Sequence, residues 1–127
     1  MHNLYFYYMR FQDLLAYKKS FVLSMEIFEV SKKFPSEEKY SLTDQIRRSS
    51  RSVSANIAES SRKIRYTKHF ISKLSDSDSE NAETQTWLEY AFACNYISEE
   101  VFNNLINKSL EIGKLINYMI TNPDKFS

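Results

Sequence analysis

The scarcity of glycine and proline constrains this chain more than any other feature. Its 127 residues include one glycine and two prolines. A β-sheet protein of this length needs many tight turns, and tight turns depend on Gly, Pro and Asn-Gly pairs. A few long helices joined by short loops need very few such residues. The composition therefore predicts an all-α protein, and the length suffices for a single domain with one hydrophobic core.

Apolar residues recur at helical spacing along most of the chain, which predicts four long helices. The first apolar stripe contains Phe11, Leu14, Leu15, Phe21, Val22, Met25 and Phe28. Pro35 ends that helix, and the second is expected to open at Ser41. The third is expected over about 67–93, and the fourth from a cap at Ser98 to a stop at Pro123. We predict an up-down antiparallel four-helix bundle over residues 11–122, after an N-terminal extension of residues 1–10.

The predicted fourth helix is apolar over a wide arc. Two adjacent stripes run along it, whereas a helix in a monomeric bundle needs an apolar arc of only about 100°. The second stripe consists of Phe102, Ile106, Ile116 and Ile120. We interpret this stripe as a contact with another subunit, which predicts a homo-oligomer. The alternative is that the aromatic segment from Leu4 to Tyr8 covers it. That segment is either native or the product of a start upstream of Met9.

Charge is segregated along the chain although the total nearly cancels, with 17 Lys and Arg against 16 Asp and Glu. The segment from Asp44 to Lys73 holds eight basic and two acidic residues, whereas Leu74 to Asn107 holds seven acidic residues and no Lys or Arg. Six basic residues are candidates for contacts with phosphate: Arg47, Arg48, Arg51, Arg62, Lys63 and Arg65. The near-zero net charge argues against a protein built mainly to coat nucleic acid.

Two interpretations of the basic segment stay open. The guanidinium groups could bind the phosphates of structured RNA or another nucleic acid. Alternatively, they could form ion pairs with the acidic third helix of the same or a neighbouring subunit, as in a protein-interaction scaffold. Aromatic residues are not interleaved with the arginines as single-strand binding would require. Reversing Arg47, Arg48 and Arg51 to Glu should abolish RNA binding under the first interpretation and disrupt folding or assembly under the second.

Polar residues occupy the expected core stripe in the middle of the third helix. Buried polar side chains need hydrogen-bond partners, and the second helix is the natural source of them. The expected structural polar network consists of Asn56, Glu59, Glu80, Asn81, Glu83 and Thr84. Small residues of the second helix, such as Ser49 and Ala58, would let the neighbouring helix approach closely.

The sequence favours no catalytic or cofactor site. Cys94 has no nearby histidine, and one glycine cannot build a glycine-rich phosphate loop. Glu80 and Glu83 lack the Glu-x-x-His units that di-metal bundles use. We therefore expect no enzymatic activity, cofactor, metal or small-molecule substrate. A single cysteine, no secretory signal and no bilayer-spanning stretch predict a reduced, cytoplasmic setting without membrane contact.

Two stretches identify a family resemblance. The first is "FQDLLAYKKSFVLSMEIFEVSKKFPSEEKYSLTDQIRRSSRSVSANIAES" and the second is "ENAETQTWLEYAFACNYIS". From Phe11 to Met119 the chain resembles the bacterial four-helix-bundle proteins encoded by 23S rRNA intervening sequences. It departs from their pattern at Ser54, which replaces a frequent Pro, and at Ser60 and Asn95, which replace Gly. Ser60 and especially Asn95 tolerate a left-handed backbone better than most residues.

The resemblance implies a fold more clearly than a function. It implies an up-down four-helix bundle that assembles into a ring, commonly a pentamer, without enzymatic activity. Relatives of the family include the accessory protein of diversity-generating retroelements, a basic barrel that binds nucleic acid and a reverse transcriptase. This chain lacks that strong basic excess. The family's name describes where its genes lie and is not evidence of RNA binding.

Overall fold

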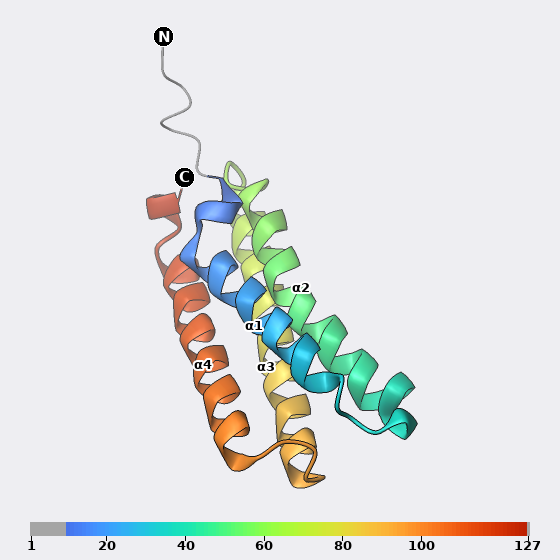
Figure 1. The fold of residues 1–127 in the computed structure, drawn as a ribbon. Coiled ribbons are helices and arrows are strands. Elements are labelled where there is room, and N and C mark those ends of the chain that lie inside the picture. Colours follow the sequence, from blue (N-terminus) through green and yellow to red (C-terminus); the bar gives the residue numbers. More distant parts are fainter. Residues whose placement is uncertain (1–9, 127) are drawn as a thin grey trace.

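The computed structural model describes residues 10–126 and shows four helices that run alternately up and down (Figure 1). They are α1 (Leu15–Ser31), α2 (Asp44–Ser61), α3 (Thr67–Ala93) and α4 (Glu99–Thr121). Figure 1 places the α2–α3 turn, the start of α1 and the end of α4 at the same end of the bundle. The predicted all-α four-helix bundle is confirmed. The predicted extension lies outside the described residues except for Arg10, as does the aromatic segment from Leu4 to Tyr8.

Short helical turns occupy the connections and the ends. They are η2 (Phe11–Asp13), η3 (Ser36–Glu38), the π-helical turn η4 (Lys39–Thr43) and η5 (Pro123–Phe126). Because of η4, α2 begins three residues later than the predicted start at Ser41. The Glu38 carboxylate accepts hydrogen bonds from the Ser41 hydroxyl at 2.5 Å and from the Leu42 backbone N–H at 3.4 Å. Glu38, and not Ser41, therefore caps this segment.

The buried face of α1 differs from the predicted stripe. Leu15, Phe21, Val22 and Met25 are each 45–55% exposed. The face toward the core consists of Ala16, Ser20, Leu23, Ser24, Ile27 and Ser31. The serine hydroxyls donate to the backbone carbonyls three residues earlier, at 2.7–3.0 Å. Since their hydroxyls are satisfied within the helix, these small residues can be buried and leave the larger apolar residues outside.

Much of the wide apolar surface of α4 is buried in the core of its own bundle. Leu105, Ile112 and Ile116 are each at most 1% exposed. The prediction that Ile116 lies at a subunit interface is therefore wrong, because this side chain is enclosed by its own chain. The other three residues of that stripe are half-buried: Phe102 stacks on Phe92 with ring centroids 4.7 Å apart, and Ile106 and Ile120 pack against the core.

Two positions need a particular residue type: Asn95 at the end of α3 and Gly113 where α4 approaches α3. Asn95 has φ 64°, and it is the one non-glycine residue with positive φ among residues 10–126. The Tyr96 N–H donates to the Ala91 carbonyl, and the Asn95 N–H donates to the Phe92 carbonyl, so α3 ends in a Schellman motif. The predicted left-handed tolerance at Asn95 is thus used. Gly113 lies inside α4, where an added Cβ would be 3.4 Å from the Asn81 amide nitrogen.

Candidate nucleic-acid interface

The six basic candidates fall into two groups with different surroundings. Arg47, Arg48 and Arg51 lie along α2, beside α1 and α3. The other three, Arg62, Lys63 and Arg65, lie in the α2–α3 turn. In the sequence these residues form one basic segment. In the structure, the side chains of the first group have partners, and those of the second group have no ion pair or side-chain hydrogen bond within residues 10–126.

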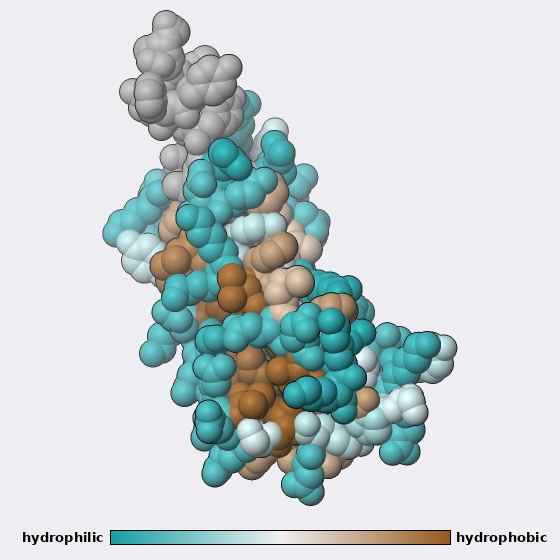
Figure 2. Space-filling model, viewed as in Figure 1, coloured by the Kyte–Doolittle hydropathy of each residue, from teal (hydrophilic) through white to brown (hydrophobic). Residues whose placement is uncertain are grey.

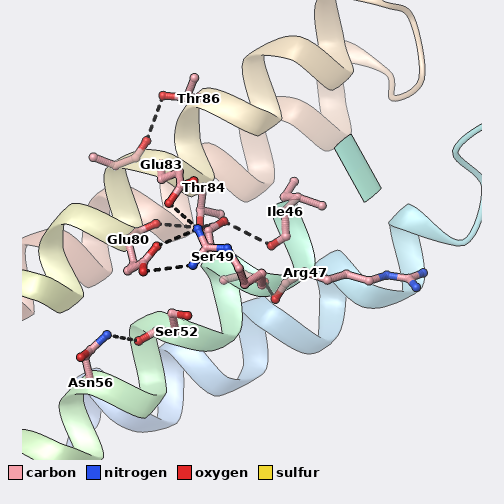
Figure 3. A network of polar contacts seen from close by, with 12 residues as sticks. Ile46, Arg47, Ser49, Ser52, Asn56, Glu80, Glu83, Thr84 and Thr86 are labelled. Atoms are coloured by element: carbon pink, nitrogen blue, oxygen red, sulfur yellow. Dashed lines mark hydrogen bonds and ion pairs between the residues drawn. The ribbon is translucent and has the colours of Figure 1, made fainter. Parts of the chain in front are cut away.

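Arg48 is paired with two carboxylates of α3. Its Nη1 lies 3.3 Å from Glu80 Oε2, and its Nη2 lies 2.7 Å from Glu83 Oε2. Figure 3 shows Glu80 and Glu83 extending from α3 toward α2. The arginine side chain is 49% exposed, so solvent screens these pairs, and each stabilises the fold by about 0–1 kcal/mol. The expected pairing between the basic and acidic helices therefore occurs here, and within one chain.

The two carboxylates influence each other's protonation. Burial, and then a hydrogen bond with Glu83, raise the pKa of Glu80 above its ordinary value in spite of the opposing effect of Arg48. Burial acts in the same direction on Glu83, but hydrogen bonds with Glu80 and Arg48 outweigh it, so the pKa of Glu83 is lowered. The hydrogen bonds from Arg48 to Glu80 and Glu83 raise the arginine's pKa. The cluster therefore holds its arginine charged and favours an ionised Glu83.

Arg47 and Arg51 contact α1. The Arg47 guanidinium lies 4.6 Å from the centroid of the Phe28 ring, and that of Arg51 lies 5.5 Å from it. Arg47 Nε also donates to the Ser31 hydroxyl at 2.8 Å. Figure 3 shows Arg47 directed away from Glu80 and Glu83. Arg47 is thus committed to the α1–α2 contact, whereas Arg51 is exposed and has the ring as its described partner.

A buried polar layer joins α2, α3 and α4. Ser49 and Thr84 share a hydrogen bond of 2.8 Å between their hydroxyls. Asn81 Nδ2 donates to the Ser109 carbonyl at 2.9 Å, and its Oδ1 accepts from the Ser109 hydroxyl at 2.9 Å. Ser77 donates to the Val53 carbonyl at 2.7 Å. The polar stripe of α3 therefore finds its partners on two helices, not on α2 alone.

Two residues of the predicted polar network have other roles. Asn56 donates to the Ser52 carbonyl of its own helix at 2.9 Å (Figure 3). The expectation that it bonds across the bundle is wrong, because the nearer backbone carbonyl satisfies its amide. Glu59 forms an ion pair with Lys73 at 3.2 Å on the exposed side of α2 and α3. Neither residue belongs to the buried layer.

The α2–α3 turn combines exposed cations with an exposed aromatic ring. Arg62, Lys63 and Arg65 are exposed and have no ion pair or side-chain hydrogen bond with any other described residue, and the same is true of Lys68 in the first turn of α3. Tyr66 lies among them and is 60% exposed. The statement that no aromatic residue is interleaved with the basic ones is therefore wrong for this turn. The signal is present in the sequence as "RKIRYTKH", where Tyr66 directly follows Arg65.

Within residues 10–126 no three His, Cys, Asp or Glu side chains are grouped closely enough to hold a metal ion. Cys94 is exposed near the end of α3. None of the helices in the described range is long and apolar enough to cross a membrane.

A family model and a solved structure match most of this chain. A family model described as "23S rRNA-intervening sequence protein" matches residues 12–118. The chain is also similar to the crystal structure of a protein of unknown function from the S23 ribosomal protein family of Bacteroides thetaiotaomicron. The two are 32% identical with a TM-score of 0.78, over 89% of this chain and 99% of the other. No curated protein matches this chain.

Proposed function

The chain belongs to the family of 23S rRNA-intervening sequence proteins, and we propose that it is a non-enzymatic, homo-oligomeric bundle that binds structured RNA through its α2–α3 turn. The observation that carries this proposal is the group of unpaired cations there. Arg62, Lys63, Arg65 and Lys68 fall within seven residues, all are exposed, and no described acid neutralises them. Exposed charges without protein partners are free to exchange their counterions for phosphates.

The N-terminus of α3 favours the binding of an anion beside the α2–α3 turn. The helix begins at Thr67, and no side chain caps its N-terminus. The first N–H groups of a helix and its dipole favour negative charge nearby. Phosphate oxygens that contact Arg65 or Lys68 would therefore meet a second favourable field. Contacts of this kind position RNA and give little base specificity.

The arginines of α2 contribute less to this proposed surface. Arg48 is neutralised by Glu80 and Glu83, and Arg47 is held by Phe28 and Ser31. A phosphate would have to displace these contacts first. The alternative is a scaffold held together by ion pairs between helices. Only the Arg48 cluster favours it among the six basic candidates, and its ion pairs lie within one subunit. Arg51 is the one α2 arginine that we keep among the proposed RNA contacts.

The assembly proposed for this chain would use the outer face of α1. Leu15, Phe21, Val22 and Met25 lie on one side of that helix, and each is about half-exposed. Figure 2 shows hydrophobic residues gathered on the face formed by α1 and α4, bordered by hydrophilic ones. The hydrophobic patches are separated by charged side chains, among them the α1–α4 ion pairs Lys19–Glu111 and Glu26–Lys108. Exposed hydrophobic patches bordered by polar residues are typical of protein contact surfaces. A second copy of the chain is our proposed occupant, and a pentameric ring follows from the family resemblance.

RNA binding is tested by fluorescence anisotropy with a labelled, structured rRNA fragment at low and moderate salt. We expect micromolar or tighter binding that weakens log-linearly with salt. Replacing Arg62, Lys63 and Arg65 with Gln should weaken binding strongly. The matched control replaces the exposed Lys33, Lys39 and Lys114 with Gln, which changes the net charge equally at scattered positions outside the proposed contact face of α1. Equal effects of the two triple variants, or no binding by the wild type at low salt, would refute the proposed site.

Assembly is tested by light scattering coupled to size-exclusion chromatography. Val22→Glu with Met25→Glu should convert the oligomer into monomers, since two charges would be buried in the contact. Helical content should persist because both positions are exposed in the single chain. The control pair Asn103→Glu with Asn104→Glu adds the same charge to an exposed part of α4. An oligomer that survives the α1 variant, or a monomeric wild type, would exclude this contact.

A further inference from the structure

Tyr66 has an unusual environment for an exposed aromatic side chain. It is 60% exposed at the N-terminal boundary of α3, between Arg65 and Lys68. Its described ring contact is an edge-on approach to His69, with centroids 6.2 Å apart and planes 79° apart. In the described part of the chain, no other ring and no cation lies over its face. The flat surface of the ring is therefore available to a planar partner.

Hydrogen bonds fix the backbone that carries this ring. The Tyr66 N–H donates to the Lys63 carbonyl at 2.8 Å, and the Tyr66 carbonyl accepts from the Phe70 N–H at 2.9 Å. Ile64, two residues earlier, is half-buried against the core and anchors the turn. The exposed ring thus sits on an ordered turn at the start of a long helix. A positioned ring loses less conformational entropy on binding than a ring on a mobile loop would.

Other exposed tyrosines have different surroundings. Tyr40 is 81% exposed, with the ammonium of Lys39 5.3 Å from its ring centroid. Tyr118 has Lys125 over its ring and the Phe126 ring at its edge. Tyr66 alone among these combines an uncovered face with several unpaired cations. An aromatic platform inside a cationic patch is the arrangement with which proteins hold unpaired nucleotides.

We propose that Tyr66 stacks on an unpaired base of the RNA while the cations around it contact the flanking phosphates. This inference rests on the proposed function and specifies its ligand: RNA with a bulge, loop or single-stranded end at the bound position. Bases of a regular duplex are stacked on each other and cannot reach the ring, whereas a displaced base can. Because every base has a π-face, the platform selects an unpaired nucleotide and not a particular sequence.

The test compares two labelled RNA duplexes that differ by one bulged nucleotide, a 2-aminopurine. We expect the wild type to bind the bulged duplex about 5- to 100-fold more tightly and to change the 2-aminopurine fluorescence, as base–aromatic stacking would. Tyr66→Ala should remove the preference and the fluorescence change and leave the affinity for the regular duplex and the salt slope intact. Tyr66→Phe should retain both. The control Tyr40→Ala, at a ring that is more exposed than Tyr66, should behave as the wild type.

The outcomes separate this inference from the proposed function. If the wild type binds both duplexes equally and with a steep salt dependence, the cationic surface stands and the stacking platform is refuted. A preference that survives Tyr66→Ala also refutes the platform, with circular dichroism and thermal melting confirming that the variant folds. If the wild type binds neither duplex at low salt, the proposed function fails and this inference fails with it.

Discussion

Two basic regions of the same chain differ in what surrounds them. In the middle of α2, Arg48 lies between Glu80 and Glu83, and Arg47 lies on Phe28 with a hydrogen bond to Ser31. At the α2–α3 turn, the basic side chains face solvent and form no ion pair or hydrogen bond with another side chain of the described residues. The comparison teaches that a count of charges along the sequence does not locate a binding surface. Only charges that the fold leaves uncompensated can serve a ligand without a prior rearrangement.

The largest expected effect comes from reversing the charge of the turn. Arg62→Glu, Lys63→Glu and Arg65→Glu together should lower the affinity for a structured rRNA fragment at least about 100-fold, since three phosphate contacts become repulsions. The melting temperature should hardly change because these side chains are exposed and form no ion pair or side-chain hydrogen bond within the described fold. Anisotropy and circular dichroism on one preparation measure both quantities. A loss of helical structure would instead place these residues in the architecture of the bundle.

The buried polar layer should show the opposite behaviour. Asn81→Ala leaves the Ser109 carbonyl without its amide partner and should lower the free energy of unfolding by about 1–3 kcal/mol. RNA affinity should be unchanged. Denaturant unfolding measures the loss, and Asn104→Ala, at an exposed position of α4, is the control. A variant as stable as the wild type would contradict the role we give to this layer.

Substitutions in the Arg48 cluster should change stability less, and part of the change should come from the interaction between two side chains. Arg48→Met and Glu83→Gln should each destabilise the protein, and the double variant should reveal a coupling energy of about 0.5–1 kcal/mol, the range for partly exposed ion pairs. Neither change should alter the salt dependence of RNA binding. A coupling near zero would mean that the two side chains act independently and that the crossing of α2 and α3 does not depend on them.

The smallest effect concerns pH. The lowered pKa of Glu83 means that its contribution to stability is present above the ordinary carboxylate range, near pH 4.3, and is lost as the pH falls through the lowered value. Glu80, with its raised pKa, acts in the reverse sense, and its contribution fades as the pH rises. The stability difference between the wild type and Glu83→Gln should therefore be larger at pH 7 than at pH 3. A difference independent of pH would argue against an ionised Glu83.

The sequence predicted the helices better than it predicted their faces. The low glycine content and the long apolar periodicity determine four helices, and the bounds of α3 match the expected 67–93. The face of α1 was assigned wrongly because large apolar residues occur on both sides of it. Which side is buried depends on Ser20, Ser24 and Ser31, whose hydroxyls bond within the helix. No pattern of hydrophobicity carries that information.

The candidate site could be predicted only in part, for a related reason. The sequence offers the pairing of arginines with the acidic helix as one of two interpretations, and which arginine pairs depends on the register between α2 and α3. A shift of one residue would turn Arg47 toward Glu83 in place of Arg48. The separation of the basic segment into a paired and an unpaired group follows from that register. The exposure of Tyr66 depends instead on its place in the turn, directly before α3.

The most direct test measures the slope of the logarithm of RNA affinity against the logarithm of salt concentration for three proteins. These are the wild type, the turn variant Arg62→Gln, Lys63→Gln, Arg65→Gln, and the helix variant Arg47→Gln, Arg48→Gln, Arg51→Gln. We predict that the turn variant lowers the magnitude of the slope by about 2–3 without loss of stability. The helix variant should lower it by no more than about 1, for Arg51, and should melt at a lower temperature. The reverse result, a slope lost with the helix arginines and kept without the turn cations, would contradict our assignment of the two regions.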